Sequence, residues 1–216
     1  MMYRLSVLAA VLLVFVTASF VGAESKRPIY FPLGTWAVEE HWSPMEKTLF
    51  YEEWFGNQLL AMGEPSLART KLDEGAVAVR LLVLPTFTPA FAIHFEKRVD
   101  GLTRLEATLL DGAGGYAPGR VDQRYSRELP RSDLDEVLKH LEQLSLMNGG
   151  QIERRDAACS DGTQFVLEIA RQAYFHAVDV HHCQALPPVW ALIDEILALV
   201  PELGPYCDGC FQRDFD

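Results

Sequence analysis

The sequence lacks the short motifs that identify the common enzyme families. It contains no Gly-x-Ser-x-Gly, no His-Glu-x-x-His, and no grouping of Ser, His and Asp that spacing alone could assemble. The glycine-rich stretch LLDGAGGYAPG lacks the Gly-Lys-Ser/Thr ending of a phosphate-binding loop and precedes a predicted strand instead of a helix. The sequence therefore predicts no cofactor and gives no support for catalysis.

Positive charge is also scarce. Lys and Arg total 19 against 30 Asp and Glu, which gives a formal net charge of −11 at pH 7. The longest basic patch, IERRD, is too small to reverse this excess. Because an acidic surface repels nucleic acid and anionic membranes, we expect neither as a partner. A cationic protein partner is compatible with this charge.

A long apolar run occurs at the N-terminus. Arg4 supplies a short basic region, an unbroken apolar stretch follows, and TASFVGA places Val21 and Ala23 at the −3 and −1 positions. This pattern predicts a secretory signal peptide over residues 1–23. An uncleaved membrane anchor is the alternative, although the run is short for a spanning helix of about 20 residues. We expect residues 24–216 to form a single domain with a cysteine-containing C-terminal tail.

Cysteine is absent before position 159. Cys159, Cys183, Cys207 and Cys210 all lie in the last third of the chain. In an exported chain, this even number predicts two disulfides. The motif YCDGC follows a predicted helix instead of opening one, so the helix dipole that activates a thioredoxin-type thiol is missing. We expect a local disulfide there, with redox activity or half of a four-cysteine zinc site as alternatives.

Apolar periodicity and turn signals predict an α+β fold. The expected order is α-ββββ-α-ββ-α, with about six mainly antiparallel strands and helices packed on the sheet. Ser43 and Glu46 form a capping box at the start of the first helix, Ser132 is the expected cap of the second, and Asp100-Gly101 is a two-residue hairpin turn signal. The first four strands are expected at 76–84, 90–99, 102–110 and 120–129.

Two helices differ in the clarity of their apolar pattern. The last one, PPVWALIDEILALV, has a single buried side, whereas the apolar residues of the first are spread along SPMEKTLFYEEWFGNQLLAM. The last helix is expected to bury Val189, Trp190, Ile193, Ile196, Leu197 and Val200. The first takes its apolar residues from Met45, Leu49, Phe50, Leu59 and Leu60.

The stretch YFHAVDVHHC concentrates potential metal ligands on one predicted strand. If Arg171-Gln172 is the hairpin turn, strand alternation places His176 on the apolar face and Asp179, His181 and Cys183 on the other. Same-face neighbours are about 6.6 Å apart, which suits two ligands, whereas a closed zinc site needs four. We therefore predict no metal, keep that trio as the group to test, and expect His176 to be a hydrogen-bonded core residue.

The same register bears on disulfide pairing. It places Cys183 opposite Ser160, next to Cys159, at the open end of the hairpin. Strict alternation would turn Cys159 away, so a bond needs a bulge or fraying, which Asp161-Gly162 could provide. We favour a Cys159–Cys183 disulfide, with pairing to the C-terminal tail as the alternative.

Three segments can be compared with known proteins: FYEEWFGNQLLAMGEPSL, LLDGAGGYAPG and SDGTQFVLEIARQAYFHAVD. Together they resemble a group of exported bacterial proteins of unknown function. The shared pattern is an aromatic–acidic EPSL segment, an LDG-GGY-PG loop, and DG before a strand that turns into YH. The likeness covers roughly residues 48–182, but here Gln164 displaces the aromatic residue after DG and Phe175 separates Tyr174 from His176. The resemblance implies a bacterial exported domain and no activity.

These observations predict a periplasmic or secreted protein that is not an enzyme. We expect it to bind another protein or an envelope component, as inhibitors and immunity proteins do. The expected contact surface is an open face of the sheet or the loop Asp111–Gly119, with Asp111 and Tyr116 as candidate contacts. The alternative is an enzyme, either a thiol–disulfide enzyme using Cys207 and Cys210 or a hydrolase whose site forms only in three dimensions.

Overall fold

The computed structural model describes residues 28–37, 42–100, 102–112 and 116–207. The predicted signal peptide and Cys210 lie outside these residues. The helices are α1 (Pro44–Met62), α2 (Arg131–Gln143), α3 (Pro187–Ala198) and the short α4 (Gly204–Cys207). The strands are β1 (Val77–Pro85), β2 (Phe91–Lys97), β3 (Thr103–Leu110), β4 (Val121–Leu129), β5 (Thr163–Arg171) and β6 (Tyr174–His181).

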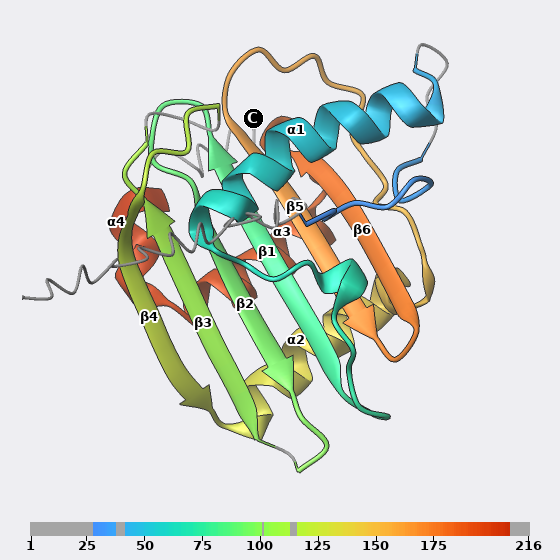
Figure 1. Ribbon diagram of the computed structural model, residues 1–216, viewed down its shortest axis with the longest axis vertical. Helices are drawn as coiled ribbons and strands as arrows, with labels where there is room; N and C mark the ends of the chain where they lie inside the picture. Colours follow the sequence, from blue (N-terminus) through green and yellow to red (C-terminus); the bar gives the residue numbers. More distant parts are fainter. Residues whose placement is uncertain (1–27, 38–41, 101, 113–115, 208–216) are drawn as a thin grey trace, which may run out of the picture.

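All six strands form one antiparallel sheet in the order β4-β3-β2-β1-β5-β6. Helix α1 crosses one face, whereas α2, α3 and α4 lie behind the other (Figure 1). The predicted α+β class and the order of its elements are confirmed. Since helices lie on both faces, the open sheet face expected as a contact surface is instead occupied by α1.

The helix ends follow local sequence signals at α1 but not at α2. The hydroxyl of Ser43 accepts from the Glu46 amide while the Glu46 carboxylate accepts from the Ser43 amide, so the predicted capping box is present. Gly63 ends α1 with a left-handed φ of 71°. The predicted cap of α2 is wrong, because Pro130 occupies the cap position and Ser132 lies inside the first turn.

The β5–β6 hairpin differs from its predicted register by two residues. Gln164 lies opposite His181 and Arg171 opposite Tyr174, so Gln172-Ala173 forms the turn. Strand β5 continues to Arg171 because its ladder with β1 reaches that residue, a constraint that the hairpin alone does not contain. A shift of two preserves the alternation, so the predicted faces are correct.

The β2–β3 connection is longer than the two-residue turn that was predicted. Lys97 pairs with Thr103, and the Arg98 amide donates to the Leu102 carbonyl at 3.0 Å. The carboxylate of Asp100 accepts from the Leu102 amide at 3.1 Å, a local hydrogen bond that stabilises the turn. The Asp-Gly signal therefore located the hairpin correctly but not its length.

Among the described residues, the two larger of three buried apolar clusters lie on opposite sides of the sheet. One packs α2 and α3 against it, and the predicted buried side of α3 is confirmed, with Leu197 partly buried. The other packs α1 through Phe55, Leu59 and Met62, together with the segment around Tyr30 and Phe31. Other apolar residues of α1 are exposed outside this second core, namely Met45, Leu49, Phe50 and Leu60.

Candidate functional site

The outward side of α1 exposes large apolar side chains. Met45 and Leu49 are 60% and 62% exposed, and Trp42 and Phe50 about 40%. A helix that is apolar on all sides is normally buried on all sides, but α1 packs against the sheet on one side only. An exposed apolar surface of this kind is typical of a site where another molecule docks.

Aromatic rings on this side form a continuous row. The rings of Trp42 and Phe50 are 5.5 Å apart, those of Phe50 and Trp54 are 5.7 Å apart, and Trp54 stacks on Tyr116 at 5.0 Å with an interplanar angle of 9°. Because neighbouring rings restrict each other's rotamers, the surface loses little conformational entropy on binding. We call Trp42, Met45, Leu49, Phe50, Trp54 and Tyr116 the α1 aromatic ridge.

The charged side chains beside the ridge are acidic. Glu46 and Glu53 are exposed on α1, whereas the ammonium of Lys47 is turned inward and donates to the Ala37 carbonyl at 2.8 Å. The ridge therefore combines an apolar centre with negative neighbours. Such a surface is complementary to an apolar patch flanked by Lys or Arg.

The two candidate contact residues of the β3–β4 loop, Asp111 and Tyr116, have different roles in the structure. Asp111 accepts from the Arg120 amide at 2.6 Å, so its carboxylate closes the base of the loop. A Cβ at Gly112 would lie 1.7 Å from the Ala117 carbonyl oxygen, so this position requires glycine. Tyr116, 72% exposed, is the candidate that joins the ridge.

A cluster of buried charges lies beneath α1. Arg80 of β1 is fully buried between Glu64 and Glu168. Its Nη1 donates to the Pro65 carbonyl at 2.7 Å and lies 3.3 Å from a Glu64 oxygen, while Nη2 pairs with Glu168. The Nδ1 of His94 lies 3.2 Å from the same Glu64 oxygen. Each charge has an opposite charge beside it, so we read the cluster as structural.

The two carboxyl groups of this cluster have pKa values displaced in opposite directions. Burial raises the pKa of Glu168, and the neighbouring Arg80 offsets this only in part. Burial would also raise the pKa of Glu64, but the contact with His94 and the charge of Arg80 together lower it below 4.5. Glu64 is therefore the carboxylate of the cluster whose ionised form its neighbours favour.

Asp179, one of the three residues kept as a metal candidate, is occupied elsewhere. It is buried on the α1 side of β6, where it accepts from Gln164 at 2.8 Å and from Tyr51 at 3.3 Å. Arg154 donates to its other carboxylate oxygen at 3.0 Å. With both oxygens engaged by protein donors, Asp179 acts as a structural acceptor that ties α1 and the loop before β5 to the sheet.

Cys159, not Asp179, lies beside His181 and Cys183 as the third potential metal ligand. Cys159 and Cys183 form the predicted disulfide, with their Cα atoms 6.3 Å apart. A ring nitrogen of His181 lies within 4.8 Å of both sulfur atoms. The β5–β6 ladder ends at Gln164, and the chain that precedes β5 leaves the sheet at Gly162. This departure from strand pairing is the fraying that the predicted disulfide required.

Two further sequence candidates have different outcomes. His176 is buried, and its Nε2 lies 2.8 Å from the Gly150 carbonyl, which confirms the expected core histidine. Cys207 ends α4, but its side chain is not among the described groups, and Cys210 lies outside the described residues. A disulfide in the C-terminal tail therefore stays a prediction.

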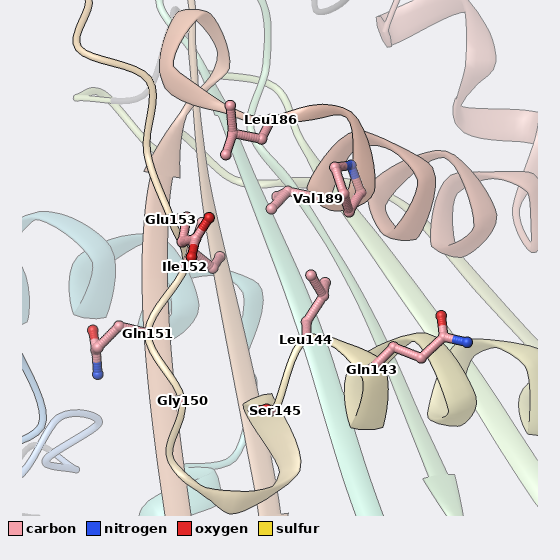
Figure 2. Close-up of a pocket in the computed structure, with 10 residues that line it drawn as sticks. Gln143, Leu144, Ser145, Gly150, Gln151, Ile152, Glu153, Leu186 and Val189 are labelled. Atoms are coloured by element: carbon pink, nitrogen blue, oxygen red, sulfur yellow. The ribbon is translucent and has the colours of Figure 1, made fainter.

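A pocket of about 300 Å³ opens between the end of α2, the loop before β5 and the start of α3 (Figure 2). Leu144, Ile152, Leu186 and Val189 surround the opening, whereas the amide of Gln151 points away from it. Glu153 alone is ionisable among the residues that line the pocket, so they offer no acid–base pair. The complete lining is Gln143, Leu144, Ser145, Gly150, Gln151, Ile152, Glu153, Leu186, Pro188 and Val189.

Comparison with known proteins adds no functional assignment. No family model matches the chain, and no curated protein matches it significantly. Within the described residues, none of the helices combines the length and apolar character needed to cross a bilayer.

Sequence reasoning did not identify the ridge as a surface. The apolar residues of α1 surround the helix, so periodicity gave no indication of which side would be buried. The sequence did indicate such a surface indirectly, because the apolar residues of α1 are not confined to one side of the helix. A helix with more apolar sides than one sheet can cover must present some of them to another partner.

Proposed function

We propose that the protein is an exported bacterial binding protein, not an enzyme, and that the α1 aromatic ridge is its contact surface for another protein. The observation that carries this proposal is the row of contacting aromatic rings, exposed at Trp42, Phe50 and Tyr116, along a helix already packed on its opposite side. Aromatic side chains are enriched among the residues that dominate binding energy at protein interfaces.

The charge around the ridge defines the partner. Acidic neighbours, together with the net charge of −11, favour a protein surface with an apolar centre and a Lys- or Arg-rich rim. The same charges disfavour an anionic membrane surface. The Cys159–Cys183 disulfide and the resemblance to exported bacterial proteins support a location in the periplasm or outside the cell.

The test places a photoreactive residue at Leu49 and at Val99, which are 62% and 63% exposed. Both versions are irradiated in periplasmic extract, and the adducts are identified by mass spectrometry. We expect one defined partner to be linked from Leu49 and not from Val99. Binding to the purified partner should weaken as salt rises, because the rim charges become screened.

Matched substitutions then measure the contribution of the ridge. Leu49→Ser should weaken binding to that partner by at least about tenfold, as expected for a residue central to an interface. Val99→Ser removes an equally exposed apolar side chain away from α1 and should change affinity by less than about twofold. The proposal is wrong if both substitutions act equally, if Leu49 links only a second copy of this chain, or if the ridge binds lipid vesicles instead of protein.

A further inference from the structure

We propose that Cys159, Cys183 and His181 form a binding site for one Zn²⁺ ion when the Cys159–Cys183 disulfide is reduced. This site is separate from the ridge and does not depend on the function proposed for it. Two thiolates and an imidazole are a ligand set that zinc favours.

The geometry brings three ligands from two segments to one point. His181 ends β6, Cys183 follows in the next turn, and Cys159 comes from the loop before β5. One ligand atom from each lies within 4.8 Å of the other two. Small movements of the side chains would bring all three to the 2.0–2.3 Å that zinc–nitrogen and zinc–sulfur bonds require.

The ring of His181 is available for coordination. Its Nδ1 is buried and makes no hydrogen bond, which is costly for a polar atom inside a protein unless a partner binds there. A histidine nitrogen that no protein group occupies can bind a metal ion.

Gly162 allows the surrounding groups to approach closely. A Cβ at this position would lie 2.0 Å from the His182 ring and 3.1 Å from the His181 ring. A pocket of about 200 Å³, lined in part by Asp161 and His182, opens beside it. A zinc ion held by three protein ligands keeps a fourth position for water, as in zinc sites that are not closed by a fourth residue.

Opening the site requires a two-electron reduction. A dithiol reductant transfers two electrons and two protons, breaks the bond between the sulfur atoms of Cys159 and Cys183, and itself becomes a disulfide. Binding of Zn²⁺ then displaces both thiol protons to solvent. The oxidised protein offers only His181 from this set, so the redox state decides whether the ion can bind.

The experiment uses the full chain with Cys207→Ser and Cys210→Ser, which removes the other possible thiolate ligands. The protein is reduced with a phosphine without oxygen, and Zn²⁺ binding is measured by competition with a chelating dye. Co²⁺ serves as a spectroscopic probe of tetrahedral thiolate coordination. We expect one ion per reduced chain, two protons released per Zn²⁺, and no stoichiometric binding by the oxidised chain.

Substitutions separate this site from incidental binding. Loss of outer-shell partners costs zinc sites 10–100-fold in affinity, so His181→Asn, which removes a direct ligand, should cost at least about 100-fold. Cys159→Ser should do the same and should weaken the thiolate–cobalt absorption, because one of the two thiolates is lost. His140→Asn, which changes a histidine paired with Glu195 on another face, should change affinity by less than about twofold.

Stability gives a second readout in case reduction loosens the fold. Zinc should raise the melting temperature of the reduced chain and leave that of the oxidised chain unchanged, because only the reduced form gains a bound ligand. Equal zinc binding by oxidised and reduced protein, or unchanged binding in His181→Asn, would overturn the proposal.

Discussion

At the scale of single residues, the most unusual feature is the charge cluster under α1. Arg80 is completely buried, and its compensating carboxylates come from the segment after α1 and from β5. Buried ion pairs add little stability relative to apolar residues of the same size, but breaking one leaves an unpaired charge in a low-dielectric interior. The cluster therefore makes the packing of α1 on the sheet sensitive to single substitutions.

Replacement of Arg80 tests this sensitivity. Arg80→Met should lower the free energy of unfolding by about 3–5 kcal/mol, because Glu64 and Glu168 lose their cation. The double variant Arg80→Met/Glu168→Leu should recover at least about 1 kcal/mol of that loss, since it removes one of the stranded carboxyl groups. Urea denaturation measures both values. A double variant less stable than the single one would contradict this account.

Glu64 predicts a dependence on pH. Its pKa in the folded protein lies below the ordinary value of 4.5, so ionised Glu64 contributes stability above about pH 4.5 that is lost as the pH falls. Glu64→Gln removes this contribution. The stability difference between wild type and variant should shrink as the pH falls from about 5 toward 3.

Denaturation in urea at several pH values measures that difference. Glu53→Gln, which changes an exposed carboxylate on the same side of the sheet, is the control and should shift stability by less than about 0.5 kcal/mol throughout. If the difference in the free energy of unfolding between wild type and Glu64→Gln instead grew as the pH fell, the pKa of Glu64 would be raised and not lowered in the folded protein.

At the scale of secondary-structure elements, the β5–β6 hairpin carries a local strain. Ala173 in its turn has a φ of 54°, in the left-handed region that disfavours residues with a Cβ. The ladder of β5 with β1 fixes where the turn falls, so the chain adopts this conformation although no glycine is present. Pairing across the sheet thus prevails over the turn preference of the local sequence.

Ala173→Gly should therefore stabilise the protein by about 0.5–1 kcal/mol, since glycine adopts positive φ without a steric penalty. Thermal unfolding followed by circular dichroism measures the change. Ala157→Gly, in the loop before β5 where φ is not positive, is the matched control and should give no gain. Equal effects of the two substitutions would argue against strain in the turn.

At the scale of the whole molecule, the long connection between α2 and β5 is held to the sheet at several points. Arg154 bridges to Ala185 and to Asp179, and the disulfide fixes Cys159 to the end of β6. These contacts keep an extended segment of little regular structure against the β6 edge. The disulfide is also the bond whose reduction would open the proposed zinc site.

Cys159→Ser/Cys183→Ser should lower the free energy of unfolding by about 3–4 kcal/mol, because the bond closes a separation of 24 residues in the unfolded chain. Guanidinium denaturation under oxidising conditions measures the loss. Cys207→Ser/Cys210→Ser removes the predicted C-terminal disulfide and should cost less, since that bond would close a much shorter loop of the unfolded chain. An equal loss in both variants would contradict the loop-length argument.

The sequence by itself determined the order of the elements, the capping box of α1, the two faces of the β5–β6 hairpin and the Cys159–Cys183 pair. These features depend on neighbours along the chain, and strand alternation tolerates an error of two residues in register. Only the tertiary structure decided which side of α1 is exposed, which carboxylates surround Arg80, and that Cys159 replaces Asp179 beside His181. Such groupings join residues distant in sequence through β1–β5 pairing and packing across the sheet, and no local pattern encodes those contacts.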